Sequence, residues 1–197
     1  MAKLLYQGHS SIRIVTDGGT VVFLDPYVGK GYDLPADLVL VTHEHFDHNQ
    51  VRLVSMKKGG KILRHGDFLS GGKYRTIVFR DLTIEGTPAC NRNHPIDQCV
   101  GLLISVDGIK LYDAGDTSRT DYMKQRLANE NLDYALLPTD GIFNMNAEEA
   151  SKCAAVIRAK HSIPIHMNPR APFDQKIADA FHAEGKLVLK PGDEISL

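Results

Sequence analysis

The run His43-Glu44-His45-Phe46-Asp47-His48 directly follows the apolar residues 38–42, and this combination decides the expected fold. A continuous apolar run of that length is typical of a strand covered on both faces. The polar cluster is therefore expected in a loop at the carboxyl end of a buried strand, where α/β proteins commonly bind ligands. Imidazole and carboxylate groups suit zinc, manganese or iron. Four such groups this close together would crowd one ion, whereas two adjacent ions could share them.

Three further candidate ligands stand just past expected strands. They are His94, Asp116 and His166. A single aspartate after a glycine is usually a turn or cap residue, so each alone would indicate little. Their shared placement makes them candidates for the same centre. A solvated or disordered histidine-rich loop is the alternative interpretation, but the full His-x-His-x-Asp-His pattern after an apolar strand favours metal binding.

Short strands are expected in the first half of the chain, and alternating strands and helices in the second. The expected strands are residues 3–7, 11–16, 20–24, 38–42, 61–64, 74–79, 82–86, 100–106, 109–112, 134–137, 161–166, 186–189 and 193–196. The expected helices are residues 49–58, 120–129, 146–160 and 174–184. This order predicts an α/β fold of sheets covered by helices. No repeat or linker interrupts it, so one domain over residues 1–197 is expected.

The composition gives no support for several classes of protein, including nucleic-acid-binding, membrane and disulfide-rich proteins. The chain is 43% hydrophobic and 24% charged, with a formal net charge of −1. Bulk charge therefore does not predict nucleic-acid binding, although a local basic patch stays possible. No apolar stretch approaches the roughly 20 residues of a membrane span, and no signal peptide is recognisable, so we expect a cytoplasmic protein without a membrane partner. Three cysteines without a Cys-x-x-Cys pair predict neither disulfides nor a thiolate zinc site. The oligomeric state is left open.

The motifs together resemble those of metallo-β-lactamase-fold hydrolases, in particular a small branch akin to ascorbate-phosphate lactonases. The resemblance covers nearly the whole chain. Its main motifs are Gly8-His9-Ser10, Leu24-Asp25-Pro26, the cluster at residues 43–48, His94-Pro95, Ala114-Gly-Asp-Thr117 and Ile163-Pro-Ile-His166. It implies a four-layer αβ/βα sandwich with two divalent metal ions at one sheet edge. Asn144 stands where relatives often carry a threonine or another small polar residue, and the loop at residues 90–93 varies among relatives, which leaves the substrate contacts open.

The resemblance also implies roles for individual residues. One ion would bind His43, His45 and His94, the other Asp47, His48 and His166, and Asp116 would bridge them. Asp47, Asp116 and His9 are the implied catalytic residues, with His9 as a proton donor or a hydrogen-bond partner of the substrate. Asp25 would support the metal loop by orienting a ligand. Zinc is the first choice of metal, and manganese or iron would accept the same ligands.

The expected function is hydrolysis of a small anionic ester or lactone by metal-activated water. Candidate anion-binding residues are Lys30, Arg92, Arg119 and Arg170. A phosphodiesterase or nuclease of the same fold is the alternative, although the near-neutral charge weighs against a nuclease. A non-catalytic metal- or ligand-binding protein is the third possibility. No nucleophile elbow, P-loop or dinucleotide motif occurs, so we expect a small-molecule substrate and a metal-based mechanism.

Overall fold

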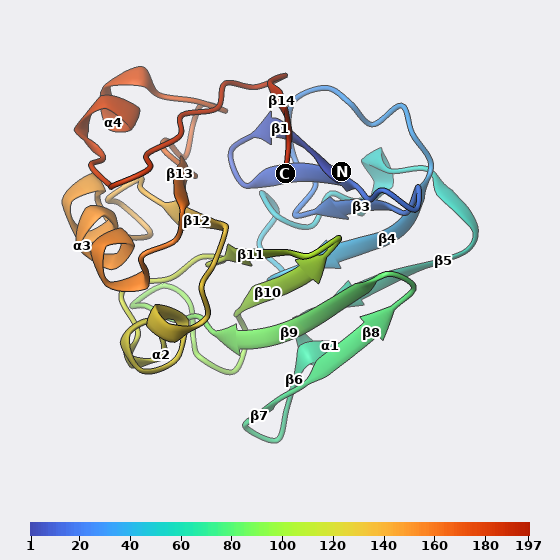
Figure 1. Ribbon diagram of the computed structural model, residues 1–197, viewed down its shortest axis with the longest axis horizontal. Helices are drawn as coiled ribbons and strands as arrows, with labels where there is room; N and C mark the ends of the chain where they lie inside the picture. Colours follow the sequence, from blue (N-terminus) through green and yellow to red (C-terminus); the bar gives the residue numbers. More distant parts are fainter.

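Two six-stranded mixed β-sheets pack face to face in the computed structural model, which describes residues 1–197 (Figure 1). The first sheet has the order β14-β1-β2-β3-β4-β5 and the second β13-β12-β11-β10-β9-β8. The strands of the first sheet are β1 (Lys3–Gly8), β2 (Ser11–Val15), β3 (Val21–Leu24), β4 (Ala36–Val41), β5 (Met56–Arg64) and β14 (Glu194–Ser196). Those of the second are β8 (Thr76–Phe79), β9 (Leu82–Pro88), β10 (Val100–Val106), β11 (Ile109–Asp113), β12 (Tyr134–Pro138) and β13 (His161–Ile165).

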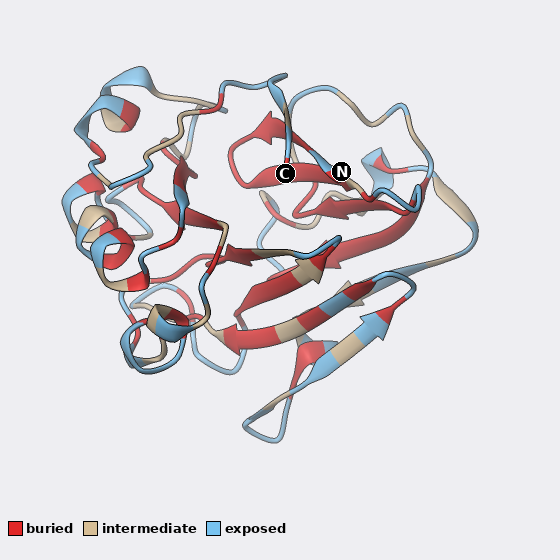
Figure 2. Ribbon diagram, in the orientation of Figure 1, coloured by how far each residue is buried: buried red, intermediate tan, exposed pale blue.

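The main hydrophobic core lies between the two sheets. Leu38 and Leu40 of β4 face this core, whereas Val39 and Val41 face a second cluster on the outer side of the first sheet. All six residues of β4 are buried, as the apolar run at residues 38–42 predicted. Figure 2 shows the same burial along β4 and β10. The strand that precedes the histidine cluster is therefore held on both faces.

The two outer layers differ in kind. Helices α2 (Asp121–Gln125), α3 (Ala147–Ile157) and α4 (Gln175–Ala180) lie beside the second sheet (Figure 1), and residues of all three pack with its outer cluster. The outer face of the first sheet is covered by Tyr32 and Leu34 of a loop and by the 3-10 turn η1 (Val51–Leu53). The layered α/β fold is confirmed, with one outer layer reduced to a loop and a single turn. No helix is long and apolar enough to cross a bilayer.

The helix expected over residues 49–58 is wrong. η1 is one 3-10 turn, and β5 begins at Met56. Met56 pairs with Ala36 and Ile62 pairs with Val39, so β5 lies parallel to β4. The two glycines expected to end the helix, at positions 59 and 60, lie inside this strand. Apolar spacing in so short a segment cannot outweigh pairing with a neighbouring strand.

Other expectations also need correction: the helix expected over residues 146–160 ends at Ile157, and the strand expected over residues 74–79 is divided between β7 and β8. The helix expected over residues 120–129 divides into α2 and the 3-10 turn η2 (Leu127–Asn129), and the one expected over residues 174–184 ends at Ala180. The strand expected at residues 186–189 is reduced to an isolated bridge between Ser162 and Lys186. Helix α1 (His65–Phe68) and the hairpin of β6 (Leu69–Ser70) and β7 (Lys73–Tyr74) were not expected. In contrast, Asn146 caps α3 as predicted, by accepting from the backbone N–H of Glu149.

A buried carboxylate helps to hold β5 beside β4. Asp37 lies 2.6 Å from Lys57 Nζ and 2.5 Å from Arg80 Nη1, and it accepts a hydrogen bond from the backbone N–H of Val21 at 2.8 Å. Burial alone would raise the pKa of Asp37. The hydrogen bonds from Lys57 and Val21 and the charges of Lys57 and Arg80 outweigh it and hold the pKa below its ordinary value of 3.8. The ionised carboxylate therefore stabilises the fold above that pH.

We expect Asp37→Asn to reduce the free energy of unfolding by about 1–3 kcal/mol at pH 7. Because the folded-state pKa is the lower one, this contribution is lost as the pH falls below about 4. The difference between wild type and variant should therefore shrink at pH 3. Urea unfolding at both pH values measures it, and a difference that stays constant would contradict the assignment.

Candidate metal centre

The seven predicted metal ligands meet at one edge of the sheets. The four from residues 43–48 follow β4, and His94, Asp116 and His166 follow β9, β11 and β13. These last three strands run in the same direction within the second sheet, because β9 and β11 are both antiparallel to β10 and β13 is linked to β11 by parallel pairs. Their carboxyl ends therefore deliver side chains to a common place.

The first group consists of three histidines. His43 Nε2 lies 3.0 Å from His45 Nδ1, which lies 3.1 Å from His94 Nε2. Ligand atoms around a tetrahedral zinc ion, with bonds near 2.0–2.1 Å, are about 3.3–3.4 Å apart. The three nitrogens are thus spaced closely enough to bind one ion.

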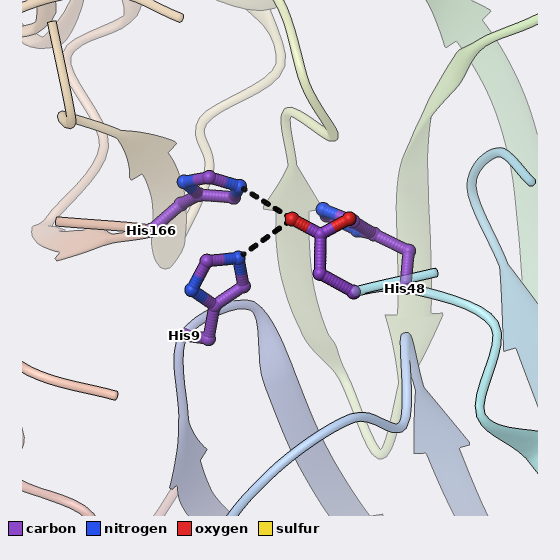
Figure 3. Close-up of side chains that lie close together, drawn as sticks. His9, His48 and His166 are labelled. Atoms are coloured by element: carbon purple, nitrogen blue, oxygen red, sulfur yellow. Dashed lines mark ion pairs between the residues drawn. The ribbon is translucent and has the colours of Figure 1, made fainter. Parts of the chain in front are cut away.

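The second group contains His9 as well as the three predicted ligands. The nitrogens of His9, His48 and His166 and a carboxylate oxygen of Asp47 all lie within 4.8 Å of one another. His9 Nε2 is 3.3 Å and His166 Nε2 is 3.8 Å from the same Asp47 oxygen, and Figure 3 shows both rings pointing toward it. His9 is buried, and its ring faces Asp47 within the centre.

Asp116 lies between the two groups. Its carboxylate is 3.2 Å from His94 Nε2 in the first group. It is also 3.3 Å from His48 Nε2 and 3.4 Å from His166 Nε2 in the second. A carboxylate in contact with both sets has the position that the predicted bridging role requires.

Most of the imidazoles are oriented by a partner on the ring nitrogen that faces away from the centre. His48 Nδ1 lies 2.7 Å from Asp25, and His166 Nδ1 lies 2.8 Å from Asp140. His94 Nδ1 lies 2.9 Å from the side-chain oxygen of Asn91. Such partners are typical of metal-binding histidines, because they hold the tautomer and the ring plane.

Several inward-facing atoms of the centre lack hydrogen-bond partners. The Nε2 atoms of His9, His48 and His166 and one carboxylate oxygen of Asp116 are buried without a hydrogen bond. Buried polar atoms are rarely left unpaired in proteins, since each costs about 1–3 kcal/mol. Divalent cations would satisfy these nitrogens and oxygens together, so the donor set fits the metal that the sequence implied.

The pKa values within the centre are shifted in different directions. Burial lowers the pKa of His43 to about 2, which keeps this ring neutral. Burial alone would raise the pKa of Asp116, but His166 and His48 outweigh it and hold the pKa far below its ordinary range. Burial would lower the pKa of His48, but Asp116 and Asp25 raise it to about 9. A metal that binds His48 must therefore displace a proton.

Three of the seven non-glycine residues with positive φ lie at this centre. His9, Asp25 and His166 have φ angles of 57°, 41° and 44°, in the left-handed region that residues other than glycine rarely adopt. Such a conformation costs about 1–3 kcal/mol and persists where the surroundings enforce it. Here the backbone N–H of His166 donates to the carbonyl of His9 at 2.8 Å. The strained residues thus support one another across the centre.

Comparison with known proteins assigns the chain to a family. A family model described as the β-lactamase superfamily domain matches residues 3–166. The chain belongs to the β-lactamase superfamily. It is 33% identical to a UPF0173 metal-dependent hydrolase of Thermus thermophilus and 28% identical to one of Thermococcus onnurineus, in both cases over 100% of each chain.

A solved structure shares the fold of this chain. Igni18, a metallo hydrolase from the archaeon Ignicoccus hospitalis, has 25% sequence identity and a TM-score of 0.75, with 98% of this chain and 97% of Igni18 covered. The metallo-β-lactamase fold and the class of metal-dependent hydrolase, both predicted from the sequence, are confirmed. The identity and the number of metal ions stay predictions.

Two residues that contact histidines of the metal centre were not predicted from the sequence. Asp140 comes shortly after β12, just as the recognised ligands follow their strands, so the same rule could have found it. Asn91 carried no such signal, because an asparagine in a loop usually serves a turn. Asp25 was expected to orient a ligand, and it does contact His48.

Two pockets open onto the β-lactamase superfamily centre and share His45 and His94. One, of about 230 Å³, is also lined by His43, Glu44, His65, Pro95, Gln98 and Cys99. The other, of about 180 Å³, is also lined by Phe46, Asp47, Asn93, Asp116, Phe143 and His166. No lysine or arginine lines either pocket. Of the candidate anion-binding residues, Arg170 lines a separate small pocket beside His9 and Tyr27.

Proposed function

We propose that this metal-dependent hydrolase cleaves small carboxylic esters or lactones at a two-ion centre. The first ion would bind His43, His45 and His94, and the second Asp47, His48 and His166, with Asp116 shared between them. The position of Asp116, in contact with nitrogens of both groups, carries this proposal. Zinc suits the nitrogen-rich set best, and manganese or iron would accept it.

The residues around the centre have distinct tasks in this reaction. Divalent ions there would supply Lewis acidity and lower the pKa of water. Asp25, Asn91 and Asp140 hold three imidazole rings, and His9 holds Asp47. The hydroxyl group of water adds to the acyl carbon, the bond from that carbon to the alcohol oxygen breaks, and the remaining proton of the water passes to the alcohol oxygen, which yields an acid and an alcohol.

A protein nucleophile is not needed for this reaction, and the nearest cysteine is unsuited to be one. Cys99 is the cysteine that lines a pocket at the centre. Burial raises the pKa of its thiol well above the ordinary value of 9.0. Because the thiolate is the reactive form, a thiol in this state is a poor nucleophile.

Carboxylic esters are favoured over phosphodiesters by the lining of the pockets. Phosphate groups are commonly bound by arginine or lysine, and neither residue lines the two pockets at the centre. The first experiment must therefore distinguish hydrolysis of carboxylic esters from hydrolysis of phosphodiesters.

We expect protein purified without chelator to contain about two divalent ions per chain. It should hydrolyse methyl butanoate or δ-valerolactone faster than bis(4-nitrophenyl) phosphate, and a chelator should abolish turnover until zinc or manganese is restored. Elemental analysis and proton-release assays measure these quantities. One ion or none after reconstitution would overturn the two-ion centre, and faster phosphodiester cleavage would put the alternative first.

A further inference from the structure

Large apolar side chains are exposed at the mouth of the metal centre. Phe46 is 66% exposed, Ile142 66% and Phe143 48%. Phe46 and Phe143 line the same pocket as Asp116 and His166, and Ile142 precedes Phe143 in the chain. Aromatic side chains left open to solvent beside converging polar groups are typical of a ligand pocket. The proposed hydrolysis assigns them no task.

The turn that carries Phe143 is held rigidly. One carboxylate oxygen of Asp140 accepts hydrogen bonds from the backbone N–H groups of Ile142, Phe143 and Asn144, at 2.6, 2.7 and 3.1 Å. The other carboxylate oxygen of Asp140 lies 2.8 Å from His166 Nδ1. The position of Phe143 is thus tied to a proposed metal ligand through one side chain.

The loop that carries His94 holds the turn from a second direction. Asn93 Nδ2 donates to the carbonyl of Phe143 at 3.1 Å, and Asn91 Nδ2 donates to the side-chain oxygen of Asn144 at 2.9 Å. Asn91 also orients His94. Asn144 and residues 90–93, which differ among relatives, therefore support the pocket wall. A pocket wall whose conformation is already fixed loses little conformational entropy when a ligand binds.

Phe46 is supported independently. Its ring packs edge-on against Tyr27, with the ring centroids 5.6 Å apart. Tyr27 in turn packs edge-on against His9, at 5.3 Å. Phe46 follows His45 and precedes Asp47 in the chain, so its backbone is placed by two residues of the centre.

We propose that Phe46 and Phe143 bind an uncharged aryl or branched-alkyl group on the acyl side of the substrate. This inference rests on the proposed hydrolysis of esters or lactones. Phe46 and Phe143 are the two hydrophobic residues among the eight that line this pocket, so an apolar group would lie against their rings. An anionic group packed against the two phenyl rings would lose its hydration there, and no lysine or arginine lines the pocket beside them. The wall therefore selects an apolar acyl group.

The test uses hydroxamates, which share one metal-binding head and differ in the attached group. Zinc-loaded protein is titrated calorimetrically with 3-phenylpropanohydroxamate, butanohydroxamate and the monohydroxamate of succinic acid. We expect the phenyl compound to bind about tenfold to hundredfold more tightly than the butano compound, and the anionic compound to gain nothing. Phe46→Ala and Phe143→Ala should each remove most of this preference without changing the zinc content. Val78→Ala, an exposed apolar residue on β8 that lines neither pocket, is the matched control.

The outcomes separate this inference from the proposed function. Equal affinities for the phenyl and butano compounds, or tighter binding of the anionic one, would overturn the apolar wall while the metal centre stands. Failure of all three hydroxamates to bind would overturn both. If the phenyl preference is present but methyl 3-phenylpropanoate and methyl butanoate are not hydrolysed, the wall is supported and the proposed reaction fails.

Discussion

Asp116→Ala is expected to reduce the metal content from about two ions per chain to one or fewer and to lower turnover roughly 10³-fold or more. Asp116 is the carboxylate that contacts both ligand groups, at 3.2 to 3.4 Å from three imidazole nitrogens. Without it, His48, His94 and His166 would lose the carboxylate that they share. Elemental analysis and an ester assay on the same preparation give both quantities.

The matched control for this variant is Asp179→Ala. Asp179 is an exposed aspartate on α4, outside both pockets. The Asp179→Ala variant should keep the full metal content and wild-type turnover. Two tightly bound ions in Asp116→Ala would contradict the bridging role and would call for a different division of the ligands.

Asp25→Ala is expected to lower the free energy of unfolding by about 3 kcal/mol or more and to weaken metal binding roughly tenfold to hundredfold. The Asp25 carboxylate accepts hydrogen bonds from the backbone N–H and the hydroxyl of Thr42, at 2.8 and 2.6 Å, and it contacts His48 Nδ1 at 2.7 Å. All these groups are buried. Removal of the carboxylate leaves the Thr42 N–H and His48 Nδ1 without a partner and the Thr42 hydroxyl with His43 Nδ1 alone, a large loss against a typical domain stability of about 5–15 kcal/mol.

Two comparison variants show whether the loss of metal follows from Asp25 or from lower stability alone. Asp25→Asn tolerates the left-handed backbone better than alanine and keeps one acceptor, so it should be less destabilised. Asp37→Asn removes a buried carboxylate far from the ligands, so it should lose stability and keep its metal. Urea unfolding with a chelator present measures stability, and competition with a chromophoric chelator measures affinity. Loss of metal in Asp37→Asn as severe as in Asp25→Ala would contradict a specific role for Asp25.

Much of the centre could be predicted because its signals are local. The apolar run of β4 and the cluster after it lie within one short stretch, and His94, Asp116 and His166 each lie beyond a recognisable strand. Strand polarity then brings carboxyl ends together. Errors in the fold occurred where local signals are weak, as in residues 49–58, whose strand depends on the partner β4.

The sequence by itself determined the α/β class and the seven candidate ligands, because residue type and strand order are written along the chain, and the family resemblance added the supporting carboxylate Asp25. Only the tertiary structure decided which side chains complete and surround the centre. It joined Asp140 to His166, set Phe46 and Phe143 in one pocket, and lined both pockets at the centre without lysine or arginine. The physical reason is that the direction and burial of a side chain depend on segments that are distant in sequence and meet only when the two sheets pack.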